Sequence, residues 1–438
     1  MASCPHPLRR NILPYFRQCR AQPLSRKVLQ SPLLCFHSTQ AATAPLTRKQ
    51  VDSDQDKLDD VFSLLRLTSI SWNRPGPAEF DFRSDVVTTP TLSMLRAILK
   101  TTLRDDVYQE DLTTSSLEQY IANLTGHEAG IFVLSGTMAN QLALRTHLTQ
   151  PPHAVLCDTR SHIIHWEAGG LASLCGAMIQ GVMPGNGEFL TLEDIQRKAV
   201  LSNDVHKCPT TVMSLENTIS GLVHPLPELQ RISDWAWRNG LKVHMDGARL
   251  WEAVATGAGS LRDFAQCADS VSLDLSKGLG APMGAIVVGN SGFVARARRI
   301  RKGMGGGMRQ AGVLSSAARA AVDDTFGPGV WGTNLGGKLR DAHDTARKAT
   351  EMWVKRGGLL RRRTETNLVW VDLTSAGISD EDFAEIGRNF GVKLDGGRIV
   401  FHYQISNEAV RKLGLVFDTV LSTRRFSSRE GRLGRGEQ

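Results

Sequence analysis

Three short apolar segments of this sequence end in residues whose side chains can do covalent or acid–base chemistry. "VMSLE" ends at Glu216, "KVHMD" ends at Asp246, and "SLDLS" leads directly to Lys277. A lysine that precedes Gly-x-Gly is not a P-loop, in which the glycines come first and Lys-Ser/Thr closes the motif. Its amine can instead form a Schiff base with a carbonyl group, while a buried carboxylate can hold a proton on a cofactor ring.

A fourth apolar segment, "IFVL", runs into "SGTMANQLAL", where small residues are typical of the start of a helix. Ser135, Gly136 and Thr137 therefore lie where free backbone N–H groups and the helix dipole favour an anion. A lysine amine, a carboxylate and an anion-binding helix start are together what pyridoxal 5′-phosphate requires. On this interpretation Lys277 forms the Schiff base, Asp246 pairs with the pyridine nitrogen, and the helix start holds the phosphate.

The elements that would position these residues alternate along the chain. Short runs rich in Val, Ile and Leu read as buried strands, and segments with helical spacing, such as residues 226–240, separate them. The pattern predicts an α/β protein with a mostly parallel sheet sandwiched by helices, and ligands at the carboxyl ends of the strands. The predicted strands are 129–134, 154–158, 211–216, 241–246, 270–275 and 284–289.

The net charge of +8 is located mainly at the two ends of the chain. Residues 1–50 contain eight Lys/Arg and no Asp or Glu, and residues 423–438 contain five Arg and two Glu. Removing these contributions of +8 and +3 leaves about −3 for the residues between them. The sequence pI near 9.2 therefore does not indicate nucleic-acid binding, and no nucleic-acid partner is expected.

The first segment has the composition of a mitochondrial transit peptide, because it is rich in Arg and Ser, lacks acidic residues and interleaves Leu, Ile and Phe. We therefore expect a mitochondrial protein, with the cytoplasm as the alternative if this segment is only an extension. No run approaches the roughly 18 apolar residues of a membrane helix, so no membrane partner is expected. The seven cysteines show no CxxC or paired spacing, so no metal site is expected.

Beyond residue 336 the pattern predicts a long helix (336–355), strands near 367–373 and 398–404, and a final helix (407–421). These elements indicate a smaller α+β domain at the C-terminal end. The predicted organisation is a transit peptide at 1–45, a linker with one short helix at 46–79, a large cofactor-binding domain at 80–335, the small domain at 336–422 and a basic disordered tail at 423–438.

Eight ordered motifs resemble those of the low-specificity L-threonine aldolases, which are pyridoxal-phosphate enzymes of the aspartate-aminotransferase-like fold, fold type I. The resemblance covers roughly residues 80–422 and implies that fold for this chain. The motifs are "FRSDVVTTPT" (82–91), "DDVYQED" (105–111), "SGTMANQ" (135–141), "HIIHWEAGG" (162–170), "SLENT" (214–218), "HMDGARL" (244–250), "LSKGLGAPMG" (275–284) and "RKGMGGGMRQAG" (301–312).

The resemblance implies roles for residues within these motifs. His162 resembles the histidine stacked on the cofactor ring, Glu167 would relay a proton through water, and Arg249 would reach the phosphate side or position Asp246. The implied catalytic residues are Lys277, His162, Asp246 and Glu167; the implied cofactor-binding residues are Lys277, Ser135, Gly136, Thr137, His162, Asp246 and Arg249; the implied substrate-binding residues are Ser84, Tyr108, Arg249, Arg309 and Arg398.

An amino-acid carboxylate is best held by a planar two-donor group, which arginine supplies and lysine does not. Arg398 resembles the family's carboxylate-binding arginine, with Ser84 and Arg309 nearby by analogy. Arg309 follows "GMGGG", a loop flexible enough to approach a ligand closely. Tyr108 would come from a neighbouring subunit, because active sites of this fold are typically shared in a dimer. The implied assembly is a homodimer or homotetramer.

The implied reaction is a retro-aldol cleavage of L-threonine, L-allo-threonine or a related β-hydroxy-α-amino acid to glycine and an aldehyde. One position departs from the family, which commonly has a histidine that contacts the substrate hydroxyl where this chain has Ile219. Isoleucine can neither donate nor accept a hydrogen bond. We therefore expect weak discrimination between the two Cβ epimers, and expect Ile219→His to sharpen it.

Two alternatives remain at this stage. Fungal alanine racemases of the same fold also resemble this chain, and a racemase needs Lys277 and Asp246 but no contact to a β-hydroxyl. A catalytically inactive relative kept as a binding protein is the other alternative, against which the intact lysine, aspartate and helix start argue.

Overall fold

The structure is a computed structural model that describes residue 63, residues 76–327 and residues 336–433. The chain divides into two units, residues 1–61 and 62–438, and the fold lies in the second of them. The predicted transit peptide lies outside the described residues. So does the predicted linker, apart from residue 63 and its last four residues.

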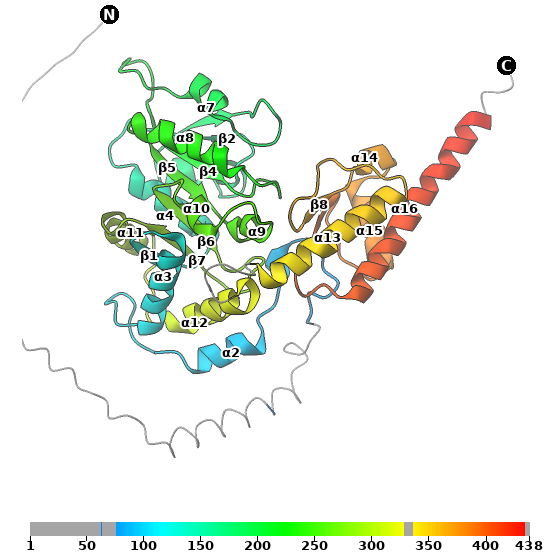
Figure 1. The fold of residues 1–438 in the computed structure, drawn as a ribbon, viewed down its shortest axis with the longest axis horizontal. Helices are drawn as coiled ribbons and strands as arrows, with labels where there is room; N and C mark the ends of the chain where they lie inside the picture. The colour runs from blue at the N-terminus through cyan, green and yellow to red at the C-terminus, as the bar shows by residue number, and fades with distance from the viewer. Residues whose placement is uncertain (1–62, 64–75, 328–335, 434–438) are drawn as a thin grey trace, which may run out of the picture. The chain divides into compact units, whose positions relative to one another are not determined.

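Among the described residues, the larger sheet has seven strands in the order β1-β7-β6-β5-β4-β2-β3 (Figure 1). β7 runs antiparallel to both of its neighbours, and the remaining pairs are parallel. The predicted mostly parallel sheet is therefore confirmed. The strands are β1 (Ala129–Val133), β2 (Ala154–Asp158), β3 (Met178–Val182), β4 (Thr210–Glu216), β5 (Lys242–Asp246), β6 (Ser270–Asp274) and β7 (Ala285–Gly289).

Strand β3, at one edge of this sheet, was not among the predicted strands. In β3 the apolar residues Met178 and Ile179 are exposed, whereas the polar residue Gln180 is buried. This is the reverse of the usual pattern of a core strand. The side chain of Gln180 is satisfied because it accepts from Thr210 at 2.5 Å and donates to the carbonyl of Cys208 at 3.1 Å. An edge strand of this kind carries no continuous apolar run that a sequence could reveal.

Helices connect the strands, and the predicted helix at 226–240 is present as α8. The helices of this part are α2 (Leu92–Leu99), α3 (Leu112–Thr125), α4 (Gly136–His147), α5 (His162–His165), α6 (Gly170–Ser173), α7 (Leu192–Lys198), α8 (Leu226–Arg238), α9 (Leu250–Ala255), α10 (Leu261–Ala265), α11 (Ser291–Gly303) and α12 (Gly312–Ala321), with short η2 (Asp85–Val87) and η3 (Val322–Phe326) segments.

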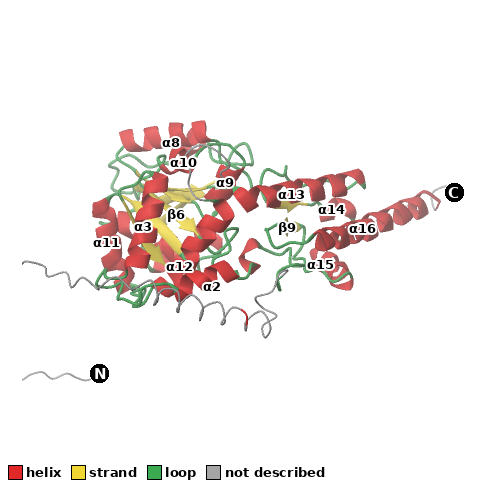
Figure 2. Ribbon diagram, turned by 60° about the horizontal axis from the view of Figure 1, so that its bottom comes forward, coloured by secondary structure: helices red, strands yellow, loops and turns green. Residues whose placement is uncertain are grey.

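Helices cover both faces of the sheet (Figure 1 and Figure 2). Alternate residues of β1 belong to different cores, as expected for a strand buried on both sides. Ile131 and Val133 pack with side chains of α4 and α11, whereas Phe132 packs in the core that includes α3, α8 and α12. The helix–sheet–helix arrangement is what leaves the carboxyl ends of the parallel strands free to carry functional side chains.

A second hydrophobic core contains α13 (Gly337–Lys355), α14 (Leu373–Ala376), α15 (Asp380–Asn389), α16 (Asn407–Leu433) and the antiparallel pair β8 (Leu368–Trp370) and β9 (Arg398–Val400). The predicted long helix, two strands and final helix are all present. Phe82 is also fully buried in this core, and its N–H donates to the carbonyl of Lys393 at 2.9 Å. The segment at 80–82 therefore packs with the second core, although the sequence assigned it to the large domain.

Helix α16 continues to Leu433, so residues 423–433 are helical rather than part of a disordered tail as predicted. The segment contains no proline, and arginine and leucine are good helix formers, so the helix continues through it. Residues 434–438 lie outside the described part of the chain. Within that part, every helix is too short or too polar to cross a membrane.

Candidate active site

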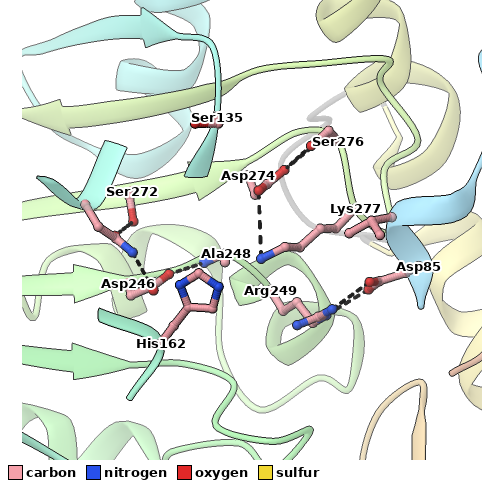
Figure 3. A network of polar contacts seen from close by, with 12 residues as sticks. Asp85, Ser135, His162, Asp246, Ala248, Arg249, Ser272, Asp274, Ser276 and Lys277 are labelled. Atoms are coloured by element: carbon pink, nitrogen blue, oxygen red, sulfur yellow. Dashed lines mark hydrogen bonds and ion pairs between the residues drawn. The ribbon is translucent and has the colours of Figure 1, made fainter. Parts of the chain in front are cut away.

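Several of the residues singled out in the sequence line one pocket at the carboxyl end of the sheet. Lys277, Asp246, His162 and Arg249 face this pocket together with residues from the ends of β4 and β5 (Figure 3). β4 and β5 are parallel neighbours, and Glu216 lies directly opposite Asp246 in their register. The additional lining residues are Glu216, Asn217, Thr218 and Ala248.

Lys277 follows the end of β6, and its side chain is 17% exposed. Its Nζ atom lies 3.8 Å from Oδ2 of Asp274, the last residue of the strand. The glycines after the lysine allow close approach of other groups, because a Cβ atom at Gly278 would collide with the carboxylate of Glu252. Gly280 has a φ of +85°, and a side chain there would collide with the hydroxyl of Tyr403. The motif therefore packs tightly around the lysine.

Asp246 is buried at the end of β5, and both of its carboxylate oxygens accept hydrogen bonds. Oδ1 accepts from the backbone N–H of Ala248 at 3.0 Å, and Oδ2 accepts from the side-chain amide of Asn140 at 2.7 Å. These two donors fix the orientation of the carboxylate. An ionised, oriented carboxylate is what a protonated pyridine nitrogen needs as a partner.

Asn140, on α4, joins the polar groups beneath the pocket and was not identified from the sequence. Its amide nitrogen donates to Asp246 and, at 2.9 Å, to Oε1 of Glu167. Its oxygen lies 3.1 Å from Nε2 of His244 and accepts from the hydroxyl of Ser272 at 2.7 Å. Burial lowers the pKa of His244 to about 4, so its ring is neutral at neutral pH and can serve as such a donor.

Glu167 is buried against His162, although the sequence suggested a proton relay through water. Oε1 of Glu167 lies 2.8 Å from Nδ1 of His162, and Oε2 accepts from the amide of Gln141 at 2.5 Å. The hydrogen bond between Glu167 and His162 raises the pKa of His162 above its usual value, although partial burial of the ring opposes this increase. Glu167 thus acts on His162 by direct contact.

Glu216, which ends one of the three apolar segments singled out in the sequence, is a half-buried carboxylate at the pocket. Its Oε2 accepts from the backbone N–H of His162 at 3.1 Å. Burial, together with the charge of the neighbouring Asp246, raises the pKa of Glu216 well above its usual range. Its position at the end of a predicted strand identified it as a candidate for acid–base chemistry, but not its partners.

Arg249 does not hold Asp246 in place, because its guanidinium is paired with Asp85 in the segment before α2. Nε donates to Oδ2 of Asp85 at 2.8 Å, and Nη2 donates to Oδ1 at 2.6 Å (Figure 3). Burial opposes the ionisation of Asp85, but the charge and hydrogen bonds of Arg249 outweigh it and lower the pKa of Asp85. The pair ties the end of β5 to the N-terminal part of the fold.

Ser135, Gly136 and Thr137 form the start of α4, as predicted. Ser135 is the N-cap, and its hydroxyl accepts from the backbone N–H of Met138 at 3.2 Å. Position 136 requires glycine, because a Cβ atom there would lie 2.8 Å from Oδ2 of Asp274. A twelve-residue helix therefore begins beside the end of β6 with the free N–H groups that bind anions.

The residues of this pocket fit pyridoxal 5′-phosphate. The amine of Lys277 and the carboxylate of Asp246 follow the adjacent strands β6 and β5, and the anion-binding start of α4 lies beside the end of β6, as the cofactor requires. In addition, Nδ2 of Asn217 and Oγ1 of Thr218 are buried at the pocket without a hydrogen-bond partner in the described part of the chain. Because such groups are rarely left unpaired, they indicate that a polar ligand belongs here.

The predicted substrate-binding residues fall into two groups. Arg398 lies near the Arg249–Asp85 pair, whose charges affect its pKa, and Ser84 is adjacent to Asp85 in the chain. Arg309 instead forms an exposed ion pair with Asp105.

Tyr108 is 72% exposed, and neither it nor Arg309 lines the pocket of Lys277. Their assignment to substrate binding stays a prediction.

Ile219 lies outside this pocket. Its side chain is buried and lines a neighbouring cavity with Phe189 and His224, whose rings stack at a centroid distance of 5.1 Å. Glu216 borders both cavities. Burial lowers the pKa of His224 to about 4. Ile219, the position at which the chain departs from the family pattern, therefore lies behind Glu216 rather than beside Lys277.

The turn that carries Ile219 is held by three residues that lie just before β8 or within it. The carboxylate of Glu365 accepts from the N–H of Val223 at 2.7 Å, and the hydroxyl of Thr366 donates to the carbonyl of Gly221 at 2.8 Å. The indole N–H of Trp370 donates to the carbonyl of Ser220 at 2.9 Å. The turn that follows Asn217 and Thr218 is thus attached to the segment 365–370, which includes β8.

His162, Glu167 and Asp246 also bring three potential metal ligands within 4.8 Å of one another. Both carboxylates already accept from the amide of Asn140, and His162 already contacts Glu167. These contacts account for the cluster as a hydrogen-bonded support for the pocket. The expectation that no metal is used stays a prediction.

Comparison with known proteins places these features in a family. The sequence profile of the beta-eliminating lyases matches residues 81–376. The chain is 52% identical to aldolase vrtJ of Penicillium aethiopicum, over 78% of this chain and 86% of that protein. It is 49% identical to alanine racemase TOXG of Cochliobolus carbonum, over 84% and 94% of the two chains. It is 45% identical to the low-specificity L-threonine aldolase of Eremothecium gossypii, over 77% and 86%.

Solved structures support the fold. The structure of Leishmania major threonine aldolase superposes with a TM-score of 0.65 at 20% identity, covering 78% of this chain and 99% of that one. A putative L-allo-threonine aldolase from Listeria monocytogenes gives a TM-score of 0.61 at 23% identity, covering 76% and 92%. At these identities the likeness shows a common fold, and it agrees with the predicted fold type I.

Proposed function

The chain belongs to the beta-eliminating lyase family, and we propose that it is a pyridoxal-5′-phosphate-dependent aldolase. The proposed reaction cleaves L-threonine, L-allo-threonine or a related β-hydroxy-α-amino acid to glycine and an aldehyde. The observation that carries the proposal is the pocket at which Lys277, Asp246 and His162 meet. Relatives named as aldolases and threonine aldolases, at 42–52% identity, support the same reaction.

Lys277 would hold the cofactor covalently, Asp246 would hold its pyridine nitrogen, and the start of α4 would hold its phosphate. When bound, the cofactor supplies an electron sink for the pair released at Cα as the Cα–Cβ bond breaks. Asp246 would support that role by pairing with the pyridine nitrogen and keeping it protonated. Asn140 and the N–H of Ala248 keep Asp246 oriented.

His162 is the residue best suited to take the proton of the substrate β-hydroxyl. Glu167 occupies Nδ1, so in the neutral ring Nε2 is the acceptor, and no described residue donates to Nε2. The ring is about one third exposed at the pocket (35%), which lets it face a ligand. Because Glu167 raises the pKa of His162, the neutral form needed for this step is populated only above that raised pKa.

Arg398 is proposed to bind the substrate carboxylate. Its Nη1 donates to the carbonyl of Arg83 at 3.2 Å, and no described carboxylate forms an ion pair with it. Arg249, the other arginine near the pocket, is occupied by Asp85. A guanidinium without a carboxylate partner is the appropriate group for bidentate binding of an amino acid.

Alanine racemisation is the second candidate function, because one relative at 49% identity is named an alanine racemase. It would use Lys277 and Asp246 in the same way but would exchange the α-proton without breaking a carbon–carbon bond. The two reactions differ in their products, so they can be separated without any assumption about the active site.

The test is to incubate the full chain, loaded with pyridoxal phosphate, with L-threonine, L-allo-threonine, phenylserine and L-alanine in deuterated water. Aldehyde release from the β-hydroxy amino acids, absent in Lys277→Ala, is the expected result. Fast deuterium incorporation into alanine with no aldehyde from any substrate would establish the racemase instead. A chain that takes up no cofactor would contradict both enzymatic functions.

We also propose that the protein acts as a homodimer or homotetramer in mitochondria. Large apolar side chains exposed along residues 86–112 support a covered surface; they are Val86, Leu99, Leu103, Tyr108 and Leu112. The acid-free, basic first fifty residues support import. Sedimentation of the purified protein tests the first proposal, and N-terminal sequencing of protein from its native cells tests the second. An intact Met1 in the cytosol would contradict import.

A further inference from the structure

Asp274 places a carboxylate at the start of α4, where the proposed cofactor phosphate must bind. Asp274 is the last residue of β6, and its Oδ1 accepts from the N–H and the hydroxyl of Ser276 at 2.7 and 2.8 Å. These two hydrogen bonds fix the plane of the carboxylate. Oδ2 is thereby directed toward Lys277 and the helix start (Figure 3).

The distance to the helix is short. A Cβ atom at Gly136 would lie 2.8 Å from Oδ2 of Asp274, so the carboxylate lies against the first residue of α4. The positive end of the helix dipole stabilises a carboxylate at this position. The same free N–H groups would hold a phosphate. The carboxylate of Asp274 and the phosphate would therefore compete for the positive N-terminal end of α4.

The other charged groups around Asp274 do little to offset this competition. Arg249 lies close enough to be affected by Asp274, but it is paired with Asp85. Glu252 lines a small pocket beside Asp274 and adds a further acidic group, which contacts His343 at 2.6 Å. Lys277, at 3.8 Å, is the cation that faces Oδ2 directly.

We propose that Asp274 weakens the binding of the phosphorylated cofactor and so makes its occupancy depend on the cofactor concentration. This inference rests on the proposed function, because it takes pyridoxal phosphate as the ligand. A phosphate ester carries a charge of about −1.5 to −2 at pH 7. Two like charges a few ångströms apart at the buried Asp274 repel enough to change an affinity by about tenfold or more.

The experiment measures equilibrium binding to the full chain freed of cofactor, by dialysis against pyridoxal phosphate and, separately, against pyridoxal, which lacks the phosphate. Asp274→Asn keeps the size of the side chain and removes its charge. We expect it to tighten pyridoxal phosphate binding about tenfold and to change pyridoxal binding by less than about twofold. The control is Asp234→Asn, which removes one charge from the exposed face of α8 and should change neither affinity.

A second reading of Asp274 is that it only orients Lys277, and a double variant separates the two. If the carboxylate acts on the phosphate, Asp274→Asn tightens binding in a Lys277→Ala background as well. If it acts through the lysine, the effect disappears there and is equal for pyridoxal and pyridoxal phosphate in the native background. Either of the latter results would overturn the proposal.

Folding is checked by circular dichroism, and Asp274→Ser provides a second uncharged variant if the amide is not tolerated. A failure of both folded variants to tighten pyridoxal phosphate binding by at least threefold would also overturn the proposal. Cofactor binding is measured without substrate, so these results do not depend on which reaction the enzyme performs. If pyridoxal phosphate does not bind the native chain or either variant, the proposed function fails as well.

Discussion

Nδ1 of His162 lies 2.8 Å from Oε1 of Glu167, and the carboxylate is completely buried while the imidazole is about one third exposed (35%). The buried carboxylate of Glu167 therefore determines which nitrogen of the accessible His162 ring carries the proton. Because a carboxylate only accepts hydrogen bonds, Nδ1 carries the proton and Nε2 is the atom free to react. The consequence is a pH dependence that one substitution can move.

Glu167→Gln is expected to shift the acid limb of the activity profile to lower pH. Glu167 raises the pKa of His162, so its removal lowers that pKa and the neutral imidazole persists in more acidic solution. A charge-assisted hydrogen bond is worth about 1.5–3 kcal/mol, which corresponds to roughly one pH unit or more. The measurement is kcat/KM for aldehyde release between pH 5 and 9. Glu110→Gln, on an exposed residue, is the control, and an unmoved acid limb in Glu167→Gln would exclude His162 as the base.

Asn140→Asp is expected to be more damaging than Asn140→Ala. The aspartate keeps the acceptor contacted by His244 and Ser272 but replaces the amide donor by a third carboxylate beside Asp246 and Glu167. Alanine removes the donor without adding a charge, at a cost of about 1–3 kcal/mol for the unsatisfied partners. Urea denaturation measures the unfolding free energy of each variant.

The matched control for this series is Asn123→Ala, on the exposed face of α3, which should change stability by less than about 0.5 kcal/mol. Equal stability of the Asn140→Asp and Asn140→Ala proteins would contradict the expected repulsion between a carboxylate at position 140 and the carboxylates of Asp246 and Glu167.

Asp85→Asn is expected to lower the unfolding free energy by about 3–5 kcal/mol, because it leaves the Arg249 guanidinium without its buried partner. The folded-state pKa of Asp85 is lowered, so its contribution is complete above the unfolded-state pKa of about 3.9 and is lost as the pH falls toward the folded value. Guanidinium denaturation at pH 7 and at pH 3, below the unfolded-state pKa, measures both effects.

An exposed pair of similar geometry serves as the control for Asp85. Arg356 donates to both oxygens of Asp418, at 2.7 and 3.0 Å, and this aspartate is 56% exposed. Asp418→Asn should cost less than about 1 kcal/mol. Comparable losses in the two variants would show that burial does not set the strength of the Arg249 pair.

Ile219→His is now expected to affect stability more than substrate choice. Ile219 lines the cavity with Phe189 and His224, so an imidazole there must be buried away from Lys277. We expect a loss of about 1–3 kcal/mol in unfolding free energy and a change of less than twofold in the kcat/KM ratio of L-threonine to L-allo-threonine. A sharpened ratio would instead support the expectation drawn from the sequence, and would require the turn to move.

Much of this fold could be predicted because its strands are buried on both sides. Runs such as residues 284–289 are continuously apolar, and such runs identify strands without any knowledge of their neighbours. Strand β3 was not predicted because its buried residue is Gln180, a polar side chain whose hydrogen-bond partners lie about 30 residues away in the sequence. The C-terminal end of α16 was not predicted because an arginine-rich segment is typical of a solvated tail unless the helix that precedes it is known.

The residues of the pocket could be predicted where they follow a strand, and their partners could not. Lys277 and Asp246 stand at the ends of apolar runs, so the sheet itself brings them together. Asn140 lies 106 residues from Asp246, and Asp85 lies 164 residues from Arg249. Such pairs depend on how helices and loop segments pack against the sheet, and this packing cannot be derived from a single sequence.

The hydrogen bonds from Glu365, Thr366 and Trp370 to the turn at 219–223 mean that the segment directly after the pocket residues Asn217 and Thr218 is held by side chains that do not line the pocket. Laboratory evolution toward a bulkier aldehyde is therefore expected to select substitutions at these three positions as well as at the pocket. Libraries confined to the residues around Lys277 would leave that route unexplored. The effect of a pocket substitution would also depend on the genetic background at those remote positions.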